Sequence, residues 1–181
     1  MRRIRISAGG VLLLAALYFV LNTREFTALI LAAAVHELGH VCAIRLTGGK
    51  VLSVTANLTG AVIERTGTAS RPSEAICAAA GPAAGLIWSA AASELGNIFG
   101  SDTLLLSAGM SFVLSAFNLL PVLPLDGGRL LECAAGGRFA ASISLVSASA
   151  VLLLGVIAAA AGMGLAPFAA GTALMAQQLR V

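Results

Sequence analysis

Two histidines and a glutamate lie within five residues of one another in a strongly apolar stretch. The run 26–44 contains His36, Glu37 and His40 in the order His-Glu-Leu-Gly-His. On a helix, His36 and His40 lie one turn apart and project from nearly the same face. Both rings can therefore reach a single zinc ion, whose bonds to imidazole nitrogen are about 2.0–2.1 Å long. Ionisable groups in hydrocarbon are costly, and a bound metal would compensate that cost.

Glu37 is the candidate general base. It is turned by about 100° from His36 around the helix axis, so its carboxylate can face the open coordination position of the metal. There it can accept a proton from water that the metal has made more acidic. The pattern therefore predicts metal-assisted hydrolysis within a lipid bilayer.

Zinc needs a further protein ligand, and the chain has no third histidine. Asp126 follows two prolines, Pro121 and Pro124, which break a helix. It precedes Gly127–Gly128, which we expect to let the chain turn sharply after the carboxylate. A competing interpretation is that Asp126 only caps a helix or pairs with Arg129. Because the two-histidine half-site lacks a ligand, we favour coordination by Asp126.

The composition is that of a membrane protein. Of the 181 residues, 59% are hydrophobic and only 10% are charged, whereas about 25% is usual for charged residues. The mean hydropathy is +0.97. We therefore predict an all-α polytopic membrane protein in which residues 1–181 form one embedded domain. The net charge of +3 does not indicate nucleic-acid binding, since no basic stripe with aromatic residues accompanies it.

Six apolar spans are expected, and the basic residues that flank them predict the orientation of the chain in the membrane. Three of them are long enough to cross about 30 Å of hydrocarbon. With the N-terminus in the cytosol, the basic residues lie on the cytosolic side, including Arg2 and Arg180, and only Arg24 lies outside, as the positive-inside rule predicts. The three long spans are 26–46, 73–93 and 141–162, and the others are 6–22, 103–123 and 165–179.

Residues 51–65 differ from the spans because they are rich in β-branched side chains and have turn-forming residues near their middle. This pattern predicts a short, membrane-associated β-hairpin between the second and third spans. The alternative is an ordinary cytosolic loop. If the hairpin lies against the site, its edge could hold an extended peptide by strand addition.

Two motifs together resemble the site-2 protease family of intramembrane zinc metalloproteases, peptidase family M50. The first is His36-Glu-Leu-Gly-His40, and the second is Asn118-x-x-Pro121-x-x-x-Leu125-Asp126-Gly127. Residues 80–82, Ala-Gly-Pro, also resemble the middle-helix motif of the family. The resemblance covers about residues 26–130 and implies that they are the catalytic core of one metalloprotease domain, which spans residues 1–181. The chain looks most like the stage IV sporulation protein FB branch, and we expect neither a PDZ domain nor a CBS domain.

The resemblance implies an enzyme of the bacterial cell membrane that holds one zinc ion per chain and performs regulated intramembrane proteolysis. Its substrate would be a membrane protein cut in or near a transmembrane segment, such as a sigma-factor precursor or an anti-sigma factor, under control of a membrane-bound regulator. It also implies that Asn118 faces the site and orients the substrate or stabilises the oxyanion. Since His40 lies nearer the cytosolic face than His36, the site should open toward the cytosol.

Two other functions are compatible with the residues. A membrane metal-binding or transport protein would use the same ligands but would leave Glu37 without a task. A catalytically silent relative would keep the fold and lose the reaction. The complete set of ligands and base favours the protease.

Overall fold

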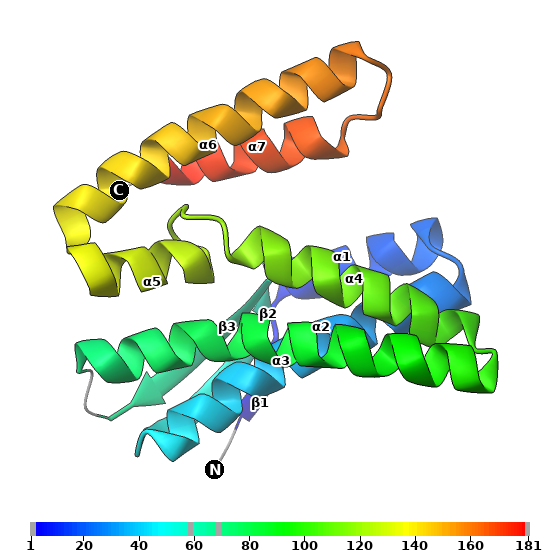
Figure 1. Cartoon of the computed structure of the whole chain (residues 1–181), viewed down its shortest axis with the longest axis horizontal. Coiled ribbons are helices and arrows are strands. Elements are labelled where there is room, and N and C mark those ends of the chain that lie inside the picture. The colour runs from blue at the N-terminus through cyan, green and yellow to red at the C-terminus, as the bar shows by residue number, and fades with distance from the viewer. Residues whose placement is uncertain (1–2, 58–59, 68–69, 180–181) are drawn as a thin grey trace. The chain divides into compact units, whose positions relative to one another are not determined.

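The computed structural model describes residues 3–57, 60–67 and 70–179. It is mostly helical and has one small sheet (Figure 1). The chain divides into two compact units, residues 1–117 and 118–181. The elements are β1 (Arg3–Ile6), α1 (Ala8–Val20), α2 (Thr23–Leu46), β2 (Lys50–Asn57), β3 (Gly60–Thr66), α3 (Arg71–Phe99), α4 (Asp102–Asn118), α5 (Asp126–Ala135), α6 (Gly137–Ala160) and α7 (Ala166–Gln178).

Helix α2, which carries both histidines, begins with a reciprocal cap. Asn22 Oδ1 accepts a hydrogen bond of 3.0 Å from the Glu25 N–H, and Glu25 Oε2 accepts one of 3.1 Å from the Asn22 N–H. Two of the donors that a helix leaves unpaired at its start are thereby satisfied. The buried face of α2 includes Ala28, Ala32 and His36 at four-residue spacing. Small side chains one and two turns before the histidine therefore let this face pack closely.

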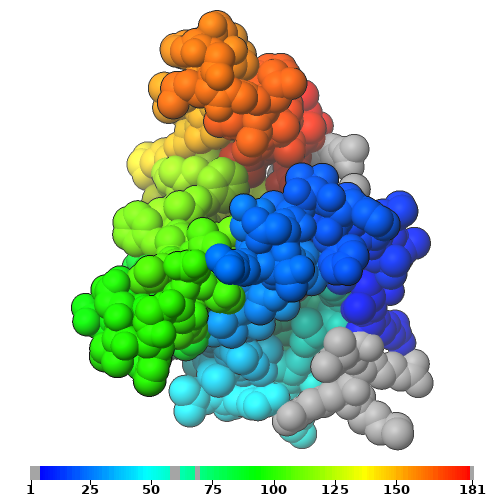
Figure 2. Space-filling view, turned by 90° about the vertical axis from the view of Figure 1, so that its right-hand side faces the viewer, coloured from blue at the N-terminus to red at the C-terminus, as the bar shows by residue number. Residues whose placement is uncertain are grey.

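The start of α2 also lies beside the start of α4. Arg24 Nη1 and Asp102 Oδ2 form an exposed ion pair of 3.0 Å. Figure 2 shows the blue N-terminal segment and the green residues of α3 and α4 adjoining at this end of the first unit. An exposed pair contributes little stability, so its value here is to mark which helix ends are neighbours.

Helices α3 and α4 pack through small and polar residues. A Cβ built on Gly85 would lie 2.2 Å from Ser115 Oγ, so only glycine fits there. Ser111 Oγ donates a hydrogen bond of 2.9 Å to the Gly85 carbonyl, and Trp88 Nε1 donates one of 2.9 Å to Ser107 Oγ. Close backbone approach and hydrogen bonds between helices are the usual means of association where burial of apolar surface gives no advantage.

The sheet has the order β1-β2-β3, with β1 parallel to β2 and β2 antiparallel to β3. Strands β2 and β3 occupy the segment in which the sequence predicts strands. Strand β1 is not predicted, because its four residues, although they alternate between arginine and isoleucine, are too short a segment to be recognised beside a long apolar run. The Ser7 N–H donates to the Ala56 carbonyl at 3.0 Å, which joins the end of β1 to β2. Membrane association of this sheet stays a prediction.

Among the described residues, three helices are long and apolar enough to cross a membrane, namely α2, α3 and α6. These helices cover the three segments that the sequence marks as long enough to cross a membrane. Helix α1 is apolar but has only 13 residues. The expected fourth span ends early, since α4 stops at Asn118, before Pro121. Arg2 and Arg180 lie outside the described residues, and the six-span count and the orientation stay predictions.

In the second unit, α6 and α7 run side by side in opposite directions (Figure 1). Two glycines allow their backbones to touch. A Cβ on Gly155 would lie 2.7 Å from the Pro167 carbonyl oxygen, and one on Gly171 would lie 2.6 Å from Leu152 Cα. These contacts fix the register between the two helices, because neither can slide without a backbone collision.

Candidate metal centre

The two histidine rings of α2 meet as their spacing predicts. His36 Nε2 and His40 Nε2 are 3.3 Å apart, and the ring planes are inclined at 77°. His36 is buried, with 4% of its surface exposed. Two nitrogens bound tetrahedrally at about 2.0–2.1 Å from one zinc ion would be separated by about 3.3 Å. The pair therefore has the spacing of two ligands of a single zinc ion.

A backbone carbonyl orients the His40 ring. Its Nδ1 lies 2.7 Å from the Cys77 carbonyl oxygen of α3. Because a carbonyl can only accept, Nδ1 carries the proton, and the neutral ring then presents the lone pair of Nε2. A hydrogen bond at the second nitrogen is the usual means by which a protein fixes a histidine ligand. Sequence reasoning missed this contact, since it comes from a main-chain carbonyl and not from a side chain.

Gly81 provides the space for the same ring. A Cβ built on Gly81 would lie 2.1 Å from His40 Nε2, and one on Gly39 would lie 2.4 Å from the Ala80 carbonyl oxygen. Helices α2 and α3 therefore approach closely at the candidate site, and the ring lies directly against the α3 backbone. Gly81 belongs to the Ala-Gly-Pro stretch at 80–82, which the sequence marks by its resemblance to a family motif.

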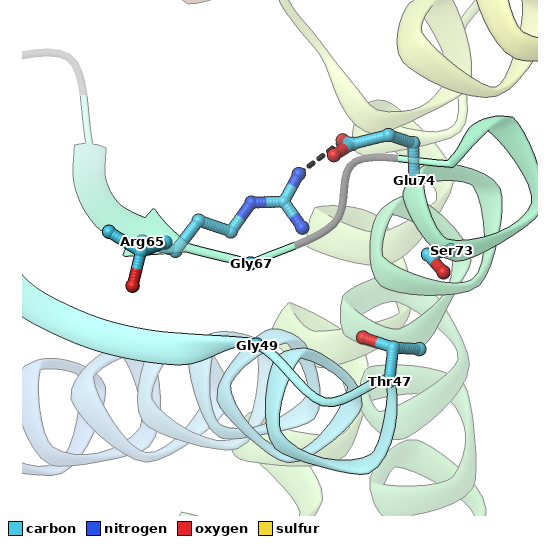
Figure 3. Close-up of a pocket in the computed structure, with 7 residues that line it drawn as sticks. Thr47, Gly49, Arg65, Gly67, Ser73 and Glu74 are labelled. Atoms are coloured by element: carbon cyan, nitrogen blue, oxygen red, sulfur yellow. Dashed lines mark hydrogen bonds and ion pairs between the residues drawn. The ribbon is translucent and has the colours of Figure 1, made fainter.

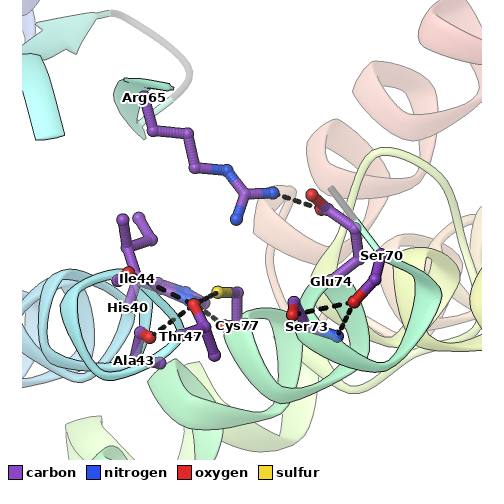
Figure 4. A network of polar contacts seen from close by, with 9 residues as sticks. All are labelled: His40, Ala43, Ile44, Thr47, Arg65, Ser70, Ser73, Glu74 and Cys77. Atoms are coloured by element: carbon purple, nitrogen blue, oxygen red, sulfur yellow. Dashed lines mark hydrogen bonds and ion pairs between the residues drawn. The ribbon is translucent and has the colours of Figure 1, made fainter. Parts of the chain in front are cut away.

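Polar contacts continue from His40 toward the end of α2 (Figure 4). The Cys77 thiol lies 3.7 Å from Thr47 Oγ1, and Thr47 Oγ1 donates a hydrogen bond of 2.9 Å to the Ala43 carbonyl. Cys77 is buried. Its carbonyl thus contacts His40 of α2 and its thiol contacts Thr47, the residue that caps the end of α2, and the two contacts hold α3 against that helix.

An open pocket adjoins this network (Figure 3). Thr47, Gly49 and Ser73 contribute to its lining, and Arg65 points from β3 toward Glu74 in the first turn of α3. Arg65 and Glu74 form an ion pair. This pair joins the end of the sheet to the start of the helix that carries Cys77. We assign no ligand to the pocket.

Glu37 and the two residues of the second motif take different positions in the fold. Glu37 is half-buried on α2, next to His36. Asn118 is the last residue of α4 and is half-buried, and Asp126 is the buried first residue of α5. Histidines and glutamate therefore belong to the first unit, and Asn118 and Asp126 belong to the second. That these residues act together stays a prediction.

The expected turn at Gly127–Gly128 is wrong. Both glycines lie in the first turn of α5, which begins at Asp126. A Cβ on Gly127 would lie 2.1 Å from the Leu119 carbonyl oxygen, and one on Gly128 would lie 2.5 Å from Leu123 N. The glycines are required because the preceding loop folds back onto the start of the helix. They hold the segment that carries Asp126 compact instead of changing its direction.

Comparison with known proteins defines the class. Residues 89–162 match the family model of Peptidase family M50, and a longer alignment with a zinc metalloprotease covers 87% of the chain. These matches relate the chain to Peptidase family M50, the site-2 protease family. The resemblance suggested by the two motifs is confirmed, whereas assignment to the sporulation branch stays a prediction.

The individual relatives are bacterial, and the similar solved structure is archaeal. Rip3 of Mycobacterium tuberculosis, named a zinc metalloprotease, is 36% identical over 170 residues. The protein sll0528 of Synechocystis, also named a zinc metalloprotease, is 35% identical over 114 residues, which are 59% of this chain and 30% of the relative. The chain spans 42% of the length of Rip3. The site-2 protease from Methanocaldococcus jannaschii has the same fold, with a TM-score of 0.71, 21% identity and coverage of 99% of this chain and 90% of that one.

Gly81→Ala tests whether contact between α3 and the His40 ring shapes the metal centre. The added methyl would collide with Nε2, so we expect zinc affinity to fall by about tenfold or more, the usual range when the surroundings of a ligand are disturbed. The measurement is a zinc competition titration with a chromophoric chelator. Gly109→Ala is the matched control, because a Cβ there meets nothing within 4 Å, and it should bind zinc normally. Equal affinity in the two variants would contradict this account of the site.

Proposed function

We propose that this chain is an intramembrane zinc metalloprotease that hydrolyses a peptide bond in or near a transmembrane segment of a membrane protein. The observation that carries the proposal is the pair of histidine Nε2 atoms 3.3 Å apart on a helix long and apolar enough to cross a membrane. One of the two rings is oriented by a carbonyl. Named zinc metalloproteases among the relatives support the same reaction.

His36, His40 and Asp126 would together hold the zinc ion. Two nitrogens and one carboxylate oxygen are a usual ligand set for catalytic zinc, which leaves a further position for water or substrate. Burial of Asp126 at the first turn of a helix suits an ionised carboxylate, since the helix N-terminus carries partial positive charge. A buried carboxylate at this position is otherwise costly unless it is paired or binds a metal.

Glu37 and Asn118 would have separate roles in the hydrolysis that zinc promotes. Bound zinc supplies a Lewis acid that polarises the scissile carbonyl and makes water more acidic. Glu37 accepts the proton of the attacking water and passes it to the nitrogen of the leaving amine. The Asn118 amide orients the substrate or donates a hydrogen bond to the oxygen on which negative charge develops. Apolar surroundings strengthen each of these interactions.

The finer proposals concern the membrane and the substrate. We propose six spans, a cytosolic N-terminus and a site that receives water from the cytosolic side. The substrate segment would be locally unfolded, and the outer edge of β3 could pair with it as an added strand. A sigma-factor precursor or an anti-sigma factor would be a suitable substrate, controlled by a membrane-bound regulator, with a role in sporulation as one setting. Bilayer lipid would surround the spans.

Glu37→Gln tests the base and separates a protease from a metal carrier. The amide cannot accept the proton of water, so we expect zinc binding to persist while peptide cleavage falls by about a hundredfold or more, given the usual contribution of general-base catalysis. Cleavage is measured on a labelled transmembrane substrate in proteoliposomes. Glu94→Gln, an exposed carboxylate on α3, is the control and should cleave normally. Undiminished turnover by Glu37→Gln would exclude the proposed base.

Asp126→Ala tests the third ligand. Loss of one of three protein ligands should reduce the zinc content of the purified protein and abolish most cleavage. The measurement is metal stoichiometry by elemental analysis after mild chelation. Asp102→Ala is the matched control, because Asp102 is also the first residue of a helix but is exposed and paired with Arg24. Full zinc content in Asp126→Ala would show that another group supplies the bond.

A further inference from the structure

A ring of hydrogen bonds in the second unit closes on the backbone of Leu123. The Leu123 N–H donates to Ser144 Oγ of α6 at 2.7 Å. Ser144 Oγ donates in turn to Gln178 Oε1 of α7 at 2.8 Å, and Gln178 Nε2 donates to the Leu123 carbonyl oxygen. Side chains from two helices thereby satisfy both polar groups of one residue in the loop before Asp126. Every donor and acceptor role in the ring is compatible with the others.

The loop depends on this ring for part of its backbone hydrogen bonding. Pro121 and Pro124 have no N–H. The Val122 N–H donates to the Leu120 carbonyl at 2.7 Å, and the Leu125 N–H donates to the Val122 carbonyl at 2.8 Å. Between Pro121 and Leu125, Leu123 is therefore the residue whose N–H takes its partner from outside the loop. An unsatisfied N–H and carbonyl at membrane depth would each cost several kcal/mol, so a partner is required.

Leu123 also lies directly against the first turn of α5. A Cβ built on Gly128 would lie 2.5 Å from Leu123 N, and the Arg129 N–H donates to the Leu125 carbonyl at 3.1 Å. The loop and the start of the helix therefore form one packed piece. Since Asp126 is the first residue of that helix, movement of Leu123 must displace the carboxylate.

The register of α6 and α7 brings the two side chains of the ring together. Backbone contacts at Gly155 and Gly171 fix how far α7 extends along α6. Ser144 lies fully buried in the same face of α6 as Ala140 and Ala148. Gln178, the last residue of α7, then reaches both Ser144 and Leu123. Helix α7 thus has a defined contact with the loop.

We propose that Ser144 and Gln178 are positioning residues that hold Asp126 in place for the metal by clamping Leu123. The inference rests on the proposed function, in which Asp126 is a zinc ligand. The two side chains act through the loop backbone. If they served only general stability, their loss would lower the folded fraction but would leave zinc release from folded protein unchanged.

The experiment compares Ser144→Ala, Gln178→Leu and Gln178→Glu in the full chain, reconstituted in nanodiscs. Two measurements are made on folded protein, namely the rate of zinc transfer to a chelator and amide hydrogen exchange of the peptide covering 119–126. We expect zinc transfer to accelerate about tenfold or more in all three variants, together with faster exchange of the Leu123 amide in Ser144→Ala. Gln178→Glu has nearly the same shape as the native side chain. It keeps the acceptor for Ser144 and loses only the donor to Leu123. This variant should therefore stay folded even if Gln178→Leu does not.

Two matched controls use neighbouring residues of the same types. Ser149 is exposed on α6 and bonds to the Leu145 carbonyl of its own helix. Gln177 lies next to Gln178, and its buried Oε1 accepts no hydrogen bond from the described residues. Ser149→Ala and Gln177→Leu should leave both measurements unchanged. Zinc transfer as slow in Gln178→Glu as in these controls would overturn the proposal.

Asp126→Ala, measured alongside, separates failure of the clamp from failure of the proposed ligand. Unchanged exchange across 119–126 in both Ser144→Ala and Gln178→Glu would show that no clamp exists, whatever Asp126 does. A second outcome is faster exchange but normal zinc transfer in the clamp variants, together with full zinc retention in Asp126→Ala. That outcome would refute both the ligand assignment of Asp126 and the positioning role of Ser144 and Gln178. Faster exchange with faster transfer would support both.

Discussion

The hydrogen bond from His40 Nδ1 to the Cys77 carbonyl is the interaction on which the candidate metal centre depends. It selects the ring nitrogen that carries the proton and thereby directs the lone pair of Nε2 toward His36. The bond can form only because Gly39 and Gly81 let the backbones of α2 and α3 approach closely beside the His40 ring. A side chain at either position would separate α2 from α3. Chemistry at His40 is thus a consequence of backbone contact between helices.

The second unit solves a different problem, which is how to bury a carboxylate directly after a segment of backbone that is not helical. Two prolines remove donors that would otherwise need partners. The loop packs onto Gly127 and Gly128, and side chains of α6 and α7 satisfy Leu123. The result is a short irregular segment in which the N–H groups of Val122, Leu123 and Leu125 all have partners. It leads directly into the helix that begins at Asp126.

Periodicity and length predicted the long elements well. The long apolar runs of α2, α3 and α6 carry a strong signal, and the His-Glu-Leu-Gly-His pattern defined the half-site because both rings share one helix. Strand β1 and helix α5 were missed for physical reasons. Four residues of β1 are held by distant partners, and the three residues that open α5 include two glycines, which have poor helix propensity. The glycines are tolerated there because their packing against the preceding loop outweighs their poor helix propensity. Such packing cannot be predicted from the sequence of the helix alone. The contact of the Cys77 carbonyl with His40 could not be predicted for a related reason, because every residue has a carbonyl and the sequence does not distinguish this one.

The parallel pairing of β1 with β2 has a consequence for biosynthesis. Arg3 pairs with Ser53, and the first turn of α1 abuts Ala56. The N-terminal strand leaves the ribosome before its partner exists, and two apolar helices are made in between. Translation therefore separates helix insertion from sheet closure, because loop closure over such a distance must wait for both ends. During that interval the first strand has an unpaired edge, and its two arginines, Arg3 and Arg5, discourage premature pairing with other nascent chains.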